Sequence, residues 1–179
     1  MTFKATHEEE TGATSGHMAS YSVHMDFGTQ NVKLIDCILY SENGCAAGIG
    51  THQDERIEFH DCYLESNISS EYWPYAYLPD YGAMFIHSAV NGQDITNQHI
   101  VLNNCLVKST NPLATHAMFL TSIDDKWHFS PHIDATIINC TFKDGATGGA
   151  KVRMEFNLNP DSHGNNNTNL NLTYNNPIL

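Results

Sequence analysis

Short runs of alternating apolar and polar residues, rather than helical periodicity, run along this chain. One phrase recurs: two alternating apolar residues, an Asp or Asn, a Cys, a further apolar residue and a polar stop. Its copies are Val32–Ser41, Ile57–Ser66, Ile100–Ser109 and Ala135–Asp144, and a weaker fifth copy is Leu172–Leu179, with Pro177 at the cysteine position. Such short alternation predicts β-strands, and the recurrence predicts stacked structural units.

A second apolar phrase precedes each copy of the first. Its copies are Tyr21–Phe27, Cys45–Thr51, Tyr81–His87, Thr115–Thr121 and Ala150–Phe156. The chain is therefore about five copies of one two-part unit. The strand phrases are constant and the spacing between them varies, which indicates strands fixed by stacking and loops that are free to grow on the surface.

The cysteine phrase predicts a bend within each unit. Leu34, Cys37 and Leu39 can all face inward only if the chain turns at Ile35–Asp36. Asp and Asn tolerate the left-handed conformation that such a bend requires. We expect equivalent bends at His60–Asp61, Asn103–Asn104 and Ile138–Asn139, with a hydrogen-bonded ladder along them.

Four of the five cysteines occupy the same place in successive units, flanked by apolar residues. This pattern predicts a stacked column of buried free thiols that act as small hydrophobes. Cys45 begins a strand phrase, and we expect it to be buried too. The absence of a CxxC motif argues against a zinc site.

The phrase apolar-x-apolar-x-Asn/Asp-Cys-x-apolar-x-Ser resembles the coils of the pectate-lyase-like superfamily, over nearly the whole chain from Tyr21 onward. The resemblance implies an all-β fold, a single-stranded right-handed parallel β-helix (solenoid) of about five coils. We expect one domain over residues 1–179, cut from a longer chain. In it, residues 1–20 are the end of an upstream coil or an N-terminal cap, and residues 21–179 form the coils.

The net charge and the mean hydropathy of the chain limit the classes of partner that it can bind. The net charge is −12 with only 8 Lys and Arg, which excludes a nucleic-acid-binding surface. This acidity favours neutral or cationic partners over strongly anionic ones. The mean hydropathy is −0.35, and no apolar run is long enough for a membrane span.

Aligning the second phrases on Ala47, Ala83 and Ala117 predicts which residues face outward. Four large apolar residues then fall on the solvent face, and these are Met84, Ile86, Met118 and Leu120. An exposed apolar patch of this kind usually marks an interface, so it predicts a homotrimer contact or cover by a loop. The alternative is contact with a ligand.

The same alignment turns His24 and Asp26 outward beside Gly48 and Gly50, whose missing side chains would leave a hollow. His52 borders this hollow, and Asp54, Glu55 and Arg56 follow on the adjacent loop. A cluster of His and carboxylate could perform general acid–base catalysis. The candidate catalytic residues are His24, Asp26, His52 and Asp54. The alternative is a polar surface with strand glycines.

The segment Glu71–Tyr81 is the densest aromatic stretch of the chain, and flat rings stack well on sugar faces. The candidate substrate-binding residues are Tyr72, Trp73, Tyr75, Tyr77 and Trp127. The alternative is that these rings pack their loops onto the strands. The residues around Trp127, namely Asp124, Asp125, His128 and His132, match no metal signature. We expect no metal and no cofactor; the resemblance leaves calcium open, and no motif supports it.

Three hypotheses for the function follow. The first is processing of a polysaccharide, since the chain is similar to phage tailspike or appendage depolymerases and to secreted bacterial glycan enzymes. The calcium-and-arginine pattern of pectate lyases is not recognisable, which favours a hydrolase over a lyase. The second is a non-catalytic carbohydrate-binding or adhesin module, and the third is a shaft segment of a trimeric fibre or spike. All three place the protein outside the cell or on a virion surface.

Overall fold

The computed structural model describes residues 1–5, 21–26, 29, 31–42, 45–50, 55–67, 82–87, 98–112, 114, 116–121, 132–149, 152–155 and 169–175. This part of the chain is all-β, and its strands form parallel sheets. Within these ranges, no helix is long and apolar enough to cross a membrane.

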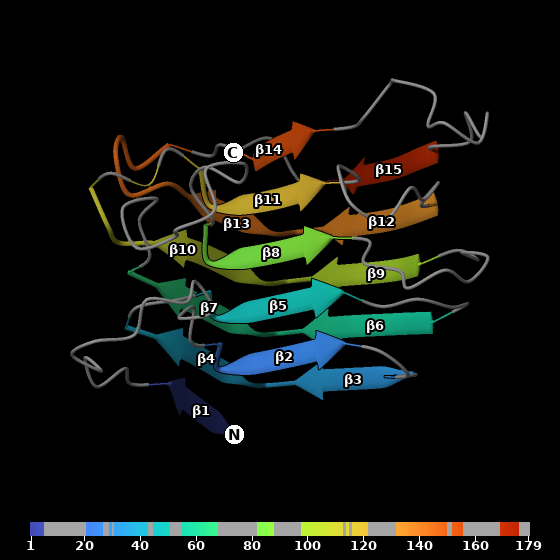
Figure 1. Ribbon diagram of the computed structural model, residues 1–179, viewed down its shortest axis with the longest axis horizontal. Coiled ribbons are helices and arrows are strands. Elements are labelled where there is room, and N and C mark those ends of the chain that lie inside the picture. Colours follow the sequence, from blue (N-terminus) through green and yellow to red (C-terminus); the bar gives the residue numbers. More distant parts are fainter. Residues whose placement is uncertain are drawn as a thin grey trace, which may run out of the picture.

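Each of three five-stranded sheets takes every third strand of the chain (Figure 1). Sheet A contains β1 (Thr2–Ala5), β4 (Ile38–Ser41), β7 (Tyr63–Ser66), β10 (Leu106–Ser109) and β13 (Thr141–Lys143). Sheet B contains β2 (Val23–Asp26), β5 (Ala47–Gly50), β8 (Met84–His87), β11 (Met118–Thr121) and β14 (Val152–Glu155). Sheet C contains β3 (Val32–Ile35), β6 (Glu55–His60), β9 (Gln98–Asn103), β12 (His132–Ile138) and β15 (Asn169–Asn175).

The repeat is thus realised as three strands. The second phrase supplies a strand of sheet B, and the cysteine phrase supplies one strand of sheet C and one of sheet A. The register agrees with the alignment of the cysteine copies, since Leu34 pairs with Phe59 and Phe59 pairs with Leu102. The strand at the start of the weak fifth copy is also confirmed, because Leu172 pairs with Ala135, while Pro177 lies outside the described residues.

The predicted bends are confirmed. Asp36, Asp61, Asn104 and Asn139 have φ angles of 51°, 54°, 55° and 52°, in the left-handed region. The main-chain amides at the first three bends donate to carbonyls of the next unit, at 2.8–3.1 Å. The side-chain ladder is present between Asn104 and Asp61, whose Nδ2 and Oδ1 atoms are 2.6 Å apart.

The buried thiols are confirmed as well: all five cysteines are reduced and buried. They belong to an interior that also contains large apolar side chains from each sheet, such as Leu39, Ile49 and Phe59. The polar stops of the cysteine phrase do not face solvent. Ser41, Ser66, Ser109 and Asp144 are all buried.

The predicted outward face of sheet B is wrong by one residue in two of its strands. Met84 pairs with Ala47 and with Met118. The residues equivalent to Ala47 are therefore Met84 and Met118. Ala83 and Ala117, which the sequence alignment placed there, stand one position earlier. A slip of one residue exchanges the two faces of a strand. Met84, Ile86 and Met118 are fully buried in the core.

Three of the four residues of the predicted apolar patch therefore belong to the core and not to the solvent face. Leu120 pairs with Ile86, and its side chain lies outside the described part. The homotrimer contact predicted through Met84, Ile86, Met118 and Leu120 has no exposed side chain among those described. The alignment was wrong because Ala46 and Ala47 are adjacent, and it is Ala46, not Ala47, that is equivalent to Ala83 and Ala117.

Candidate functional site

The outward face of sheet C gathers charged side chains from neighbouring strands. Strand alternation produces this arrangement: Ile57 and Phe59 of β6 are fully buried, so Arg56, Glu58 and His60 face outward. The register then places Lys33 of β3 opposite Glu58 and Asn103 of β9 opposite His60. We call these five residues, Lys33, Arg56, Glu58, His60 and Asn103, the Glu58 cluster.

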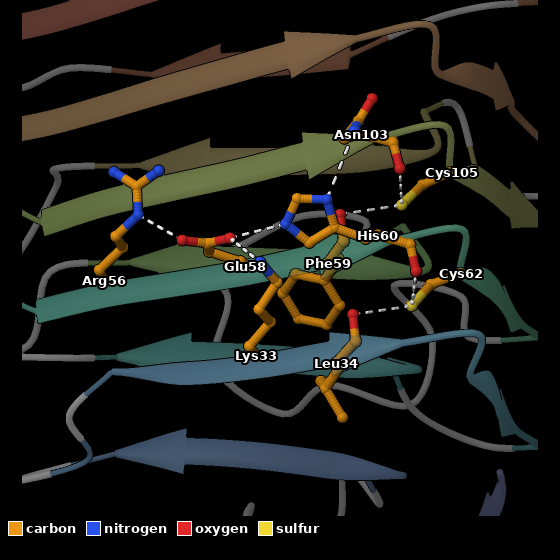
Figure 2. Close-up of polar contacts among 9 residues, drawn as sticks. All are labelled: Lys33, Leu34, Arg56, Glu58, Phe59, His60, Cys62, Asn103 and Cys105. Carbon is orange, nitrogen blue, oxygen red and sulfur yellow. Dashed lines mark hydrogen bonds and ion pairs between the residues drawn. The ribbon is translucent and has the colours of Figure 1, made fainter.

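Glu58 lies at the centre of the cluster (Figure 2). Its Oε2 atom lies 2.6 Å from His60 Nε2 and 3.1 Å from Lys33 Nζ, and its Oε1 atom accepts a hydrogen bond from Arg56 Nε. The hydrogen bond from Arg56, then those from His60 and Lys33, lowers the pKa of Glu58 to about 2. The carboxylate is therefore ionised at any ordinary pH and is an acceptor, not a proton donor.

His60 is held at both ring nitrogens. Asn103 Nδ2 lies 3.3 Å from Nδ1, and an amide nitrogen can only donate, so Nδ1 is the acceptor. Nε2 then carries the hydrogen and donates it to Glu58. Glu58 thus fixes the orientation of the ring, and Nδ1 carries the lone pair of the imidazole.

A second pair of His and carboxylate lies on the same sheet. His99 of β9 and Asp134 of β12 place Nδ1 and Oδ2 3.3 Å apart, and both side chains are about one-third exposed. His99 is the register partner of Arg56, so this pair neighbours the Glu58 cluster across one strand spacing.

The cluster carries a local excess of positive charge. Lys33 and Arg56 are each about half exposed and contribute two cations against one carboxylate. They are two of only 8 Lys and Arg in a chain of net charge −12. Arg56 uses Nε for Glu58, and Figure 2 shows its two terminal nitrogens pointing away from that carboxylate. The face therefore combines an oriented imidazole with cationic groups that can meet an anion.

Of the four predicted catalytic residues, only His24 has a described side chain. His24 is exposed, and its ring stacks on that of Tyr21, with centroids 4.6 Å apart. Asp26 pairs with Gly50 in β2 and β5, and its side chain lies outside the described part. His52 and Asp54 also lie outside it. Glu55 and Arg56 belong to β6, not to the predicted loop.

The hollow predicted over Gly48 is occupied. A Cβ atom built on Gly48 would lie 2.5 Å from Cε1 of Tyr21, so the tyrosine ring covers this glycine. The missing side chain is thus explained by close approach of an aromatic ring. The predicted substrate-binding residues Tyr72, Trp73, Tyr75, Tyr77 and Trp127 lie outside the described residues.

Sequence reasoning missed the Glu58 cluster, although a signal was present. Aligning the copies on their cysteines already places Lys33 beside Glu58, and alternation places Arg56 and His60 on the same face. Among the described residues, no three His, Cys, Asp or Glu side chains converge in a way that could hold a metal ion.

No protein-family model, no curated protein and no solved structure matches this chain.

Proposed function

We propose that the chain is a right-handed parallel β-helix of about five coils that binds and processes an acidic polysaccharide on the outward face of sheet C. The fold proposal is supported by the strand order, in which every third strand pairs in parallel with the next member of its sheet. Parallel strands joined in this way almost always follow a right-handed path.

The observation that carries the functional proposal is the row Arg56–Glu58–His60 on β6. Glu58 is ionised and accepts from His60 Nε2 at 2.6 Å, so it orients that ring. A positioned imidazole can abstract a proton near neutral pH, which is worth about 10²–10⁴-fold in rate. His60 Nδ1 is therefore the proposed general base, and the substrate must displace the Asn103 amide from it before the proton is transferred.

The cations define the kind of substrate. A proton on the carbon next to a sugar carboxylate becomes acidic when cationic groups stabilise the charge that develops on that carboxylate. Arg56 and Lys33 stand next to the base and can bind such a group. The overall charge of −12 repels anions at long range, but this repulsion is screened beyond about 10 Å, within which the local cations act.

This chemistry is an elimination. His60 Nδ1 takes the proton from the carbon next to the carboxylate. The electron pair of the broken carbon–hydrogen bond forms a carbon–carbon double bond. The bond to the glycosidic oxygen breaks, and that oxygen takes a proton from water. Hydrolysis by two carboxylates needs one that is protonated before the bond breaks. Glu58 cannot be that protonated carboxylic acid, because its pKa is about 2. The described face therefore favours a lyase over the hydrolase expected from the sequence.

The test is a panel of neutral and uronate-containing polysaccharides incubated with the protein. Unsaturated ends are followed by ultraviolet absorbance, new reducing ends by a colour reaction, and retention by affinity electrophoresis. We expect unsaturated ends from a uronate polymer, a loss of about 10²–10⁴-fold in kcat for His60→Gln, and a raised KM for Arg56→Gln.

Lys143→Gln is the matched control, because it removes the same charge as Arg56→Gln. Lys143 is exposed on sheet A, away from the cluster. Reducing ends without unsaturation would replace elimination by hydrolysis. Retention without product would leave a carbohydrate-binding module. Activity that survives His60→Gln would refute the proposed base.

A further inference from the structure

Four thiols, each at the start of a strand of sheet A, form a column in register. Cys37, Cys62, Cys105 and Cys140 occupy equivalent positions in successive repeats, each just before a strand of sheet A. The carbonyl of each of the first three accepts a hydrogen bond, at 2.9 Å, from the residue that follows the next cysteine of the column. This ladder fixes the height of each cysteine relative to its neighbours.

All four side chains are buried, between 2% and 6% exposed, and all are reduced. Each thiol lies 3.2–3.4 Å from the carbonyl oxygen two residues before it, to which it donates (Figure 2 shows this for Cys62 and Cys105). The main-chain amide of Cys105 also donates to Cys140 Sγ, at 3.4 Å.

The spacing of the column matches one type of metal coordination. Parallel strands are about 4.8 Å apart, so side chains at equivalent positions repeat at that distance. A metal–thiolate bond is about 2.3 Å long, and two such bonds in a straight line span about 4.6 Å. A soft ion that prefers two thiolates in a line therefore fits between adjacent cysteines without a change of strand spacing.

We propose that the cysteine column is a binding site for soft metal ions of linear two-coordinate preference, with one ion between Cys37 and Cys62 and one between Cys105 and Cys140. Each ion forms two sulfur–metal bonds and displaces two thiol protons to solvent, and no electron is transferred. A dication such as Hg²⁺ gives a neutral product, so no net charge is buried.

Zinc does not fit, because it needs four ligands in a tetrahedron and a straight column offers an ion only two.

The experiment uses the folded protein and HgCl₂ without reductant, followed by washing with excess monothiol to remove singly held ions. Retained mercury is counted by elemental mass spectrometry, and released protons are counted in weak buffer. We expect two ions and four protons per chain. Cys45→Ser removes a buried thiol outside the column, and we expect it to retain two ions.

Two double variants distinguish bridging from capture by single thiols. Cys62→Ser with Cys105→Ser leaves no adjacent pair and should retain no ion. Cys37→Ser with Cys140→Ser also removes two column thiols but leaves one adjacent pair, and should retain one ion. Serine can donate to the same carbonyls, which favours folding of both variants; circular dichroism checks this.

Equal retention by the two double variants would overturn the proposal, as would one ion for every thiol in the wild type. If a double variant does not fold, the single variants Cys62→Ser and Cys105→Ser decide. Each should retain one of the two ions, and retention of both would overturn the proposal. None of these outcomes depends on whether the chain acts on a polysaccharide.

Discussion

Asn104 donates a side-chain hydrogen bond to Asp61 across two neighbouring bends, and both residues are in the left-handed conformation. The bend thus needs a residue that tolerates positive φ, and the ladder needs a donor next to an acceptor. Asn fulfils both requirements at position 104, because its amide donates where a second carboxylate would repel.

Replacing Asn104 separates these two contributions. Asn104→Gly removes the hydrogen bond but keeps the φ of 55°, whereas Asn104→Ala removes the bond and also strains the backbone. Left-handed conformation costs a residue with a Cβ about 1–2 kcal/mol, so Ala should lower the free energy of unfolding by about 1 kcal/mol more than Gly. Urea denaturation measures the difference. Equal stability of the two variants would contradict a backbone requirement at this bend.

The corrected register of sheet B makes a second prediction. Met84 is fully buried, so Met84→Ala should cost about 2–5 kcal/mol of unfolding free energy, as for other large core residues. Ile38→Ala is the control, because Ile38 is 45% exposed on sheet A and should change stability by about 0.5 kcal/mol or less. Chemical denaturation of both variants checks this. A small effect at Met84 would restore the outward patch and with it the trimer contact.

The repeating part of the fold could be predicted because its determinants are local and are repeated. One cysteine phrase predicts alternation, a bend and a buried thiol, and four copies of it fix the register of sheets A and C. Sheet B could not be aligned in the same way. Its phrases carry no residue as distinctive as Cys, and the adjacent small residues Ala46 and Ala47 allow two alignments that differ by one position.

The candidate site was harder to predict for a different reason. Lys33, Glu58 and Asn103 belong to three different repeats, and only the strand register makes them neighbours. The catalytic residues predicted from the sequence lie beside glycines, and Gly48 has a structural explanation in the ring of Tyr21. Charged residues at alternate positions were visible in the sequence, but their convergence on Glu58 depends on side-chain geometry.

The contact between Tyr21 and Gly48 can be tested by a double-mutant cycle. Gly48→Ala introduces a Cβ 2.5 Å from Cε1 of Tyr21, so the ring must move and leave its stack on His24. We expect Gly48→Ala to destabilise the wild type by about 1–3 kcal/mol and to cost clearly less when Tyr21 is already Ala. Thermal or urea unfolding of the four proteins gives the coupling. Additive effects would show that the ring does not cover Gly48.

The pH dependence of stability tests the Glu58 cluster without any assay of activity. Hydrogen bonds from Arg56, His60 and Lys33 lower the pKa of Glu58 from an ordinary 4.5 to about 2 in the folded protein. Between these values the unfolded chain binds the proton and the folded chain does not, so this contribution to stability is complete above pH 4.5 and is lost as the pH falls towards 2.

We expect Glu58→Gln to flatten the acid limb of a plot of unfolding free energy against pH over this window. Glu42→Gln is the matched control, since Glu42 forms an exposed ion pair with Lys4, and such pairs are worth little. Acid limbs that are equally steep in the wild type and Glu58→Gln would mean that the three donors do not hold this carboxylate, and would remove the electrostatic support for His60 as the base.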